Sequence, residues 1–124
     1  MIYLNCHTWY SLRYGTFSVE KLCELARAFK VESLALTDIN NTSACLDFIK
    51  IASEYGIKPI VGIDFRNGAE QQYVGLAKNN EGFRQLNEHL SQQLHSKKDF
   101  KPEAPNLPDY FIIYPFEKVI ANKK

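Results

Sequence analysis

Three short segments place polar residues after apolar runs, and their side chains are of the kinds that bind metal ions. Asn5 and His7 follow the first run, at residues 3–4. Asp38 follows the second, Leu-Ala-Leu-Thr, and Asp64 lies near the end of the third. In a fold with parallel strands these ends share one rim, where ligands bind. One imidazole and two carboxylates at such a rim indicate a metal site, or what remains of one.

The chemistry that such a site would perform is phosphoester cleavage. It needs oxygen and nitrogen ligands that hold two or more cations, which polarise a phosphoryl group and lower the pKa of a bound water. A His-x-His triplet is a common first motif for these centres. Here the triplet is Asn-Cys-His, so only His7 would be a good ligand and Asn5 could offer one weak carbonyl oxygen.

Each candidate ligand also has a purely structural interpretation. His7 could be a loop histidine that hydrogen-bonds to a neighbour, and Asp38 could satisfy backbone N–H groups before the following helix. Asp64 ends a buried strand, where an unpaired carboxylate is costly, so it should have a cation or hydrogen-bond donors nearby. The sequence leaves these alternatives open.

Apolar periodicity predicts the elements that would position these residues. Strands are expected over residues 2–4, 33–37 and 60–65, with a helix of about a dozen residues in each interval. Ser18 can cap the first helix, and Thr42 or Ser43 the second. Gly56 is in the usual position to end the second helix. This order implies right-handed crossovers and a parallel sheet.

The second half of the chain continues the alternation. A strand over 73–77, which could pair antiparallel with its predecessor, precedes a helix over about 81–94. A surface loop over 95–109 follows, and residues 110–114 read as a last, buried strand. The expected fold class is α/β, a partial distorted β/α barrel with mostly parallel strands. A single domain over residues 1–124 is expected, forming about half of a larger α/β domain.

Composition and cysteine usage argue against several function classes. The formal charge of +1 provides no strong field to attract nucleic acid, which weakens, without excluding, direct DNA binding by this chain alone. No apolar stretch approaches the length of a membrane span, and the beginning does not resemble a signal peptide. Three cysteines without CxxC spacing predict neither a disulfide framework nor a zinc knuckle, and fit a reducing cytoplasm.

Several segments, taken in order, resemble a known family. Residues 4–12 are similar to His-x-His-Ser/Thr-x-Tyr-Ser-Leu, and residues 34–41 to Leu-Ala-Leu-Thr-Asp-His-Gly-Asn. Residues 56–64 are similar to Gly-Ile-Lys-Pro-Ile-x-Gly-x-Glu, and residues 76–83 to a strand-to-helix signature. Together they resemble the N-terminal PHP (polymerase and histidinol phosphatase) domain of bacterial DNA polymerase III alpha subunits.

The departures from this family pattern concern the metal ligands. Asn5 replaces the first histidine, Tyr14 replaces an acidic residue, and Ile39 replaces the histidine of Thr-Asp-His. His7 keeps the second histidine, and Asp64 shortens the expected glutamate by one methylene group. Asp38 is retained. Losses in this number predict a degenerate metal site, with no catalytic residue and no cofactor assigned.

The resemblance implies that the whole protein is a nucleotidyltransferase that synthesises DNA during replication. It also implies that the PHP domain packs on the rest of the alpha subunit and can contact the proofreading exonuclease subunit. DNA would be bound only through the whole polymerase. The chain lacks the polymerase carboxylates, so by itself it is expected to be an inactive structural and interaction module of the cytoplasm.

The sequence leaves two alternative functions open. In the first, the chain is part of an active metal-dependent phosphoesterase that acts on a 3′ DNA end, pyrophosphate or a small phosphate ester. His7, Asp38 and Asp64 would then hold Mn²⁺ or Zn²⁺, and Arg13 or Lys78 would bind phosphate. In the second, the chain is a free-standing binding protein.

Overall fold

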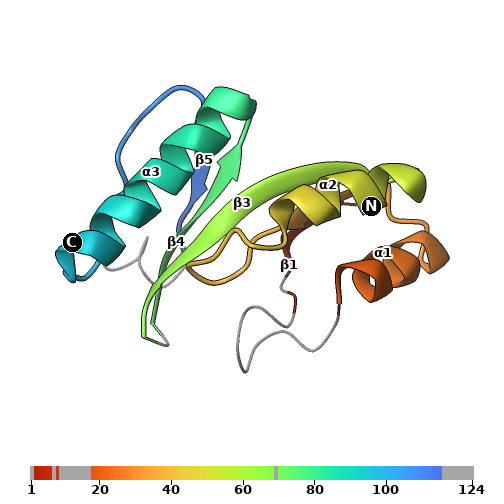
Figure 1. Ribbon diagram of the computed structural model, residues 1–124, viewed down its shortest axis with the longest axis horizontal. Coiled ribbons are helices and arrows are strands. Elements are labelled where there is room, and N and C mark those ends of the chain that lie inside the picture. Colours follow the sequence, from red (N-terminus) through yellow and green to blue (C-terminus); the bar gives the residue numbers. More distant parts are fainter. Residues whose placement is uncertain (1, 7, 9–17, 69, 116–124) are drawn as a thin grey trace.

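The computed structural model describes residues 2–6, 8, 18–68 and 70–115, with only the backbone for residues 2–5. Eight elements alternate along this part of the chain (Figure 1). In order they are β1 (Ile2–Cys6), α1 (Val19–Ala28), β2 (Ser33–Leu36), α2 (Cys45–Glu54), β3 (Lys58–Asn67), β4 (Glu70–Ala77), α3 (Asn80–Ser96) and β5 (Tyr110–Ile113).

The strands form one sheet in the order β1-β2-β3-β4-β5. The pairs β1–β2 and β2–β3 are parallel, whereas β3–β4 and β4–β5 are antiparallel. Four of the five strands therefore run in one direction, and β4 runs against them. The antiparallel step follows from the short turn at Asn67 and Gly68, which joins β3 to β4 without a crossover.

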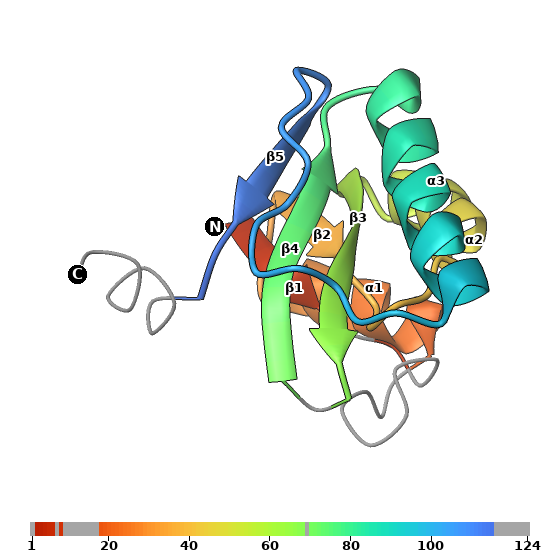
Figure 2. The same cartoon turned by 90° about the vertical axis from the view of Figure 1, so that its left-hand side faces the viewer.

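The three helices lie on the same face of this sheet, as Figure 2 shows. Val61 packs against the core formed with α1 and α2, while Ile63 and Phe65 belong to the core under α3. Alternate residues of a strand point to the same side, so all three side chains identify one face. Asp64 has the opposite parity, and its side chain therefore belongs to the other face of the sheet.

The start of α3 is fixed by close packing against the segment that precedes β5. Asn79 caps the helix, accepting a hydrogen bond from the Gly82 backbone N–H at 2.8 Å. A Cβ atom at Gly82 would overlap the Asp109 carbonyl oxygen. Only glycine allows the first turn of α3 to lie this close to another backbone.

The predicted helix ends are correct in two cases and wrong in one. Ser18 caps α1, accepting from the Lys21 N–H, and Gly56 follows α2 with a φ of 72°. The N-cap of α2 is Ala44, without a side-chain hydrogen bond, so neither Thr42 nor Ser43 caps this helix. The Thr42 hydroxyl donates instead to Asn87 of α3, because the tertiary contact competes for it.

The end of the chain differs from the prediction in its burial. The last strand is not buried along its length: Tyr110 is buried, but Phe111 is 59% exposed and Ile113 is 39% exposed. The reason is that, among the described strands, β5 pairs only with β4 and packs against the core under α3 with one of its faces. The helix before it continues to Ser96, two residues further than expected, and the loop is correspondingly shorter.

Candidate functional site

The predicted rim exists where the pairing of β2 with β3 continues past the end of β2. The Asp64 N–H donates to the Asp38 carbonyl at 3.1 Å, and the Asn40 N–H donates to the Asp64 carbonyl at 3.0 Å. Ile39 and Asp64 are partners in an isolated parallel bridge. These bonds place residues 38–40 beside residues 64–66, so Asp38 and Asp64 are neighbours in space through their backbones.

Asp64 is fully buried, and its carboxylate is bound by side chains of the β3–β4 hairpin. Arg66 donates to Oδ2 from Nε at 3.1 Å and from Nη2 at 2.9 Å. Gln71 donates to Oδ1 from Nε2 at 3.0 Å. The Arg66 side chain is only 12% exposed, so the ion pair is itself largely shielded from water. Both carboxylate oxygens of Asp64 are therefore engaged by donors from its own hairpin.

A β-bulge brings Gln71 to this carboxylate. Phe65 is paired with Tyr73, but the next residue, Arg66, is paired with Gln71, so the register shifts by one residue. Directly opposed residues of an antiparallel pair share a face, which puts Gln71 on the side of Arg66 and Asp64. Re-aiming a side chain in this way is a common consequence of a bulge.

Asn40 holds the backbone of Arg66 from the neighbouring segment. Its Oδ1 accepts from the Arg66 N–H at 3.0 Å, and its Nδ2 donates to the Arg66 carbonyl at 2.8 Å. Asn40 has a φ of 46°, a left-handed conformation that asparagine tolerates better than most residues. The Asn40 side chain thus bonds to the Arg66 backbone as a neighbouring strand would, and these two bonds fix the position from which the Arg66 side chain extends.

Asp38 makes a different set of contacts. It is buried, and it accepts from the Thr8 N–H at 2.6 Å and from the Thr8 hydroxyl at 2.7 Å. Burial, and secondarily the negative charge of Asp38, raise the pKa of Cys45 to about 12. The Asp38 carboxylate therefore joins the segment after β1 to the rim and lies near Cys45, the first residue of α2.

Among the described residues, the carboxylates of Asp38 and Asp64 are bound by different donors, Thr8 for Asp38 and the hairpin side chains for Asp64. Ile39, the bridge partner of Asp64, is the residue that shares its face, since neighbours along an extended segment point to opposite sides. An isoleucine offers no ligand atom there. The sequence motifs did not indicate Arg66, Gln71 or Asn40 as residues of this site. The position of Arg66, two residues after Asp64 on the same strand, could have predicted the ion pair.

Not every candidate residue is brought to the rim. His7 and Arg13 lie outside the described residues, and Asn5 is described only as part of the β1 backbone. Lys78 is exposed at the end of β4, beside the start of β3 and away from Asp64, with its ammonium group 4.2 Å from the centre of the Phe111 ring. Lys78 therefore does not join the carboxylates.

The donors among the described residues do not by themselves make up a multinuclear metal centre. Within residues 2–6, 8, 18–68 and 70–115, no three His, Cys, Asp or Glu side chains come together as ligands. The Asp64 carboxylate faces the Arg66 guanidinium group, and a cation could reach this carboxylate only by displacing that group. Burial raises the pKa of the Cys6 thiol, which lies near the rim, to about 11.

A large apolar groove lies elsewhere on the described surface. It has a cavity volume of about 730 Å³ and lies between α2 and the adjoining ends of β3, β4 and β5. Its apolar lining includes Leu46, Ile49 and Phe111, and the charged residues Lys58 and Lys78 border it. Neither Asp38 nor Asp64 contributes to this groove.

In the part of the chain that the structure describes, no helix is both long enough and apolar enough to span a bilayer.

Comparison with known proteins finds alpha subunits of DNA polymerase III among the similar sequences. DNA polymerase III subunit alpha of Ureaplasma parvum is 35% identical over 85 residues, which cover 68% of this chain and 9% of that protein. The Treponema pallidum protein of the same name is 33% identical over 99 residues, covering 68% and 8%. The chain thus spans less than a tenth of these relatives.

Solved structures agree on the fold. A metal-dependent phosphoesterase from Bifidobacterium adolescentis matches with a TM-score of 0.59 at 20% identity, over 77% of this chain and 32% of that one. An amidohydrolase from Chromobacterium violaceum, with bound sulfate and no metal, matches with a TM-score of 0.59 at 24% identity, over the same shares. These matches confirm the predicted partial-barrel α/β class. The family model of the PHP domain matches residues 4–122, and the chain belongs to this family.

Proposed function

We propose that this chain is the PHP module of a DNA polymerase III alpha subunit, and that its role there is structural and protein-binding. The whole protein would extend DNA from deoxynucleoside triphosphates, and DNA would be bound through that protein. The chain forms part of the N-terminal PHP domain and does not catalyse by itself. The similarity to the Ureaplasma parvum and Treponema pallidum alpha subunits supports this assignment.

One observation carries the proposal that the metal site has lapsed. The residue that shares a face with Asp64 is Ile39, which has no ligand atom, and Asp64 itself is bound by Arg66. A cation would have to displace a bidentate, largely buried guanidinium group and would gain no ligand from Ile39 in return. Loss of ligands and of their supporting contacts lowers metal affinity steeply.

The proposed partners follow from the surface and the family. The apolar groove bordered by Lys58 and Lys78 supports burial against another part of the alpha subunit. The proofreading exonuclease subunit is the second proposed partner, and the cytoplasm, where replication proceeds, is the proposed location. In this role the sheet and helices supply a rigid surface, and the rim supplies stability.

Calorimetric titration of the full-length protein with Mn²⁺ and with Zn²⁺ tests the proposal. The wild type and a His7→Ala variant are expected to give the same titration, without tight binding. Tight binding that disappears in the variant would contradict the proposal and would indicate a metal-dependent phosphoesterase. Release of nucleotides from the 3′ end of a DNA primer, measured on the same samples, would then identify the substrate class.

A further inference from the structure

The negative charge of the buried Asp64 carboxylate has to be compensated by its surroundings. It is fully buried on the helix-free face of the sheet, and an ionised carboxylate is stable there only if a positive charge or several donors compensate it. In a metal centre a divalent cation supplies that charge. Here the described structure places the Arg66 guanidinium group 2.9 Å from Oδ2.

Three features of the structure fix how Arg66 meets Asp64. Its backbone N–H and carbonyl are both bonded by the Asn40 side chain. Arg66 and Asp64 are two residues apart on one strand and so point to the same face. The bulge between β3 and β4 adds Gln71, which binds the other carboxylate oxygen. These contacts form a site around one carboxylate, in which the guanidinium group occupies the position that a cation would take beside that carboxylate.

We propose that Arg66 takes the place of a divalent cation at Asp64, so that the chain keeps this part of the fold without bound metal. The inference rests on the proposed function, in which the metal centre has lapsed. A guanidinium group is charged at every physiological pH and is attached to the chain. Metal affinity, by contrast, depends on pH and on the metal supply. The substitution therefore makes folding independent of metal.

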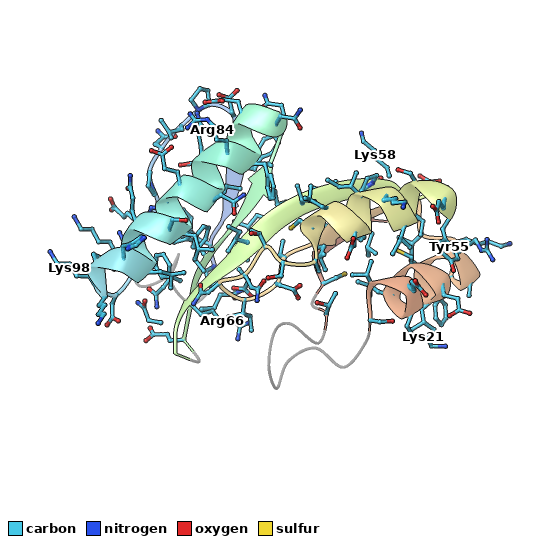
Figure 3. The ribbon with its side chains drawn as sticks, viewed as in Figure 1. Lys21, Tyr55, Lys58, Arg66, Arg84 and Lys98 are labelled. Atoms are coloured by element: carbon cyan, nitrogen blue, oxygen red, sulfur yellow. The ribbon has the colours of Figure 1, made fainter. Side chains whose placement is uncertain are left out.

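Thermal unfolding of the 124-residue chain, in EDTA and in millimolar Mn²⁺, tests whether Arg66 takes the place of a cation. Arg66→Met removes the charge and keeps most of the length of the side chain, whereas Arg66→Lys keeps a charge. Arg84→Met is the matched control, because Arg84 also forms ion pairs, with Glu81 and Glu88, but on the exposed side of α3. Figure 3 shows Arg66 at the hairpin end of β3 and Arg84 on the distant helix.

The wild type is expected to unfold at the same temperature in both solutions. Arg66→Met should lower Tm in EDTA by roughly 10 °C or more, and Mn²⁺ should recover part of that loss. The Tm of Arg66→Lys should lie between those of the wild type and Arg66→Met, and Mn²⁺ should not change it. Arg84→Met should change little in either solution. If Arg66→Met does not fold in EDTA, recovery of the native circular dichroism spectrum on refolding in Mn²⁺ is the supporting result.

The proposal that Arg66 takes the place of a cation is overturned if Arg66→Met unfolds at the same temperature as the wild type. It is also overturned if Arg66→Met loses stability, or fails to fold, equally in EDTA and in Mn²⁺. In that case the pair is an ordinary ion pair and the cation has no place to bind. Failure of the proposed function looks different, because it would appear in the wild type as tight Mn²⁺ binding and a Tm raised by Mn²⁺.

Discussion

At the scale of single residues, buried polar groups hold the rim together. Thr8 donates two hydrogen bonds to the Asp38 carboxylate, one from its backbone N–H and one from its hydroxyl group. Both residues are buried, so water cannot replace either bond without opening the structure. The rim is therefore sensitive to changes that remove a single donor atom.

Thr8→Val removes the hydroxyl donor and keeps the shape of the side chain. Because a hydrogen bond to a charged group contributes about 1.5–3 kcal/mol, the free energy of unfolding should fall by about that amount. Urea denaturation measures it. Thr8→Ser retains the hydroxyl and should keep most of the stability. Equal losses in both variants would show that packing of the Thr8 methyl group, rather than the bond to Asp38, is what matters.

His89 gives the protein a pH dependence in the acid range. Its Nε2 atom lies 2.6 Å from the Tyr73 hydroxyl, among the rings of Phe65 and Phe100. Burial lowers the pKa of His89 below its usual value of 6.5. The folded state therefore binds this proton less readily than the unfolded state. The contribution to stability is present above pH 6.5 and is lost as the pH falls toward the folded-state pKa.

His89→Gln should therefore reduce the decline of Tm between neutral pH and about pH 5. His95→Gln is the control, since His95 is exposed on the same helix. Differential scanning calorimetry over a series of buffers compares the slopes of Tm against pH. The same slope in the wild type and in His89→Gln would exclude His89 as the titrating group.

At the scale of elements, asparagine side chains connect segments that are distant in sequence. The Asn67 amide donates to the Phe100 carbonyl at 3.0 Å, and its oxygen accepts from the Phe100 N–H at 2.8 Å. Phe100 is buried in the core beneath α3. Asn67 thus anchors the long segment between α3 and β5 to the end of β3.

Replacing Asn67 by alanine should release this segment. We expect faster tryptic cleavage after Lys97 or Lys98, because local opening of the chain no longer breaks two hydrogen bonds to Asn67. Mass spectrometry of the limited digest identifies the sites. Asn106→Ala, in the exposed part of the same segment, should leave the rate unchanged. An unchanged rate in Asn67→Ala would show that Phe100 packing alone holds the segment.

At the scale of the whole molecule, the edge of the sheet at β5 is apolar. Phe111 and Ile113 are 59% and 39% exposed, and among the described strands β5 pairs only with β4. Exposed edges of this kind pair with other chains. The proposed interaction role gives the edge a use, since a partner surface would cover it.

Phe111→Lys should weaken self-association of the isolated chain. The wild type is expected to show a mass that increases with concentration in size-exclusion chromatography with light scattering, because the edge strand and its apolar side chains are exposed. Phe29→Lys is the control, since Phe29 is 72% exposed at the end of α1, away from β5. A wild type that remains monomeric at all concentrations would contradict the prediction.

The sequence by itself determined the order of elements and the location of the rim. Apolar periodicity and capping residues are local properties, so the three strands that end at Cys6, Leu36 and Asn67 and the helices between them were predictable. The motif resemblance to the PHP family was confirmed by the match over residues 4–122. Ser18 and Gly56 were correct because they act on their own helix ends.

Only the tertiary structure decided what the rim residues contact. The register that pairs Ile39 with Asp64, and the bulge that brings Gln71 to Asp64, arise between segments whose relative alignment no local pattern specifies. The same holds for Thr42, whose hydroxyl bonds to Asn87 of α3 rather than to its own helix. Whether a buried carboxylate meets a metal or an arginine depends on these long-range contacts, because its charge must be compensated by whatever side chain the fold places beside it.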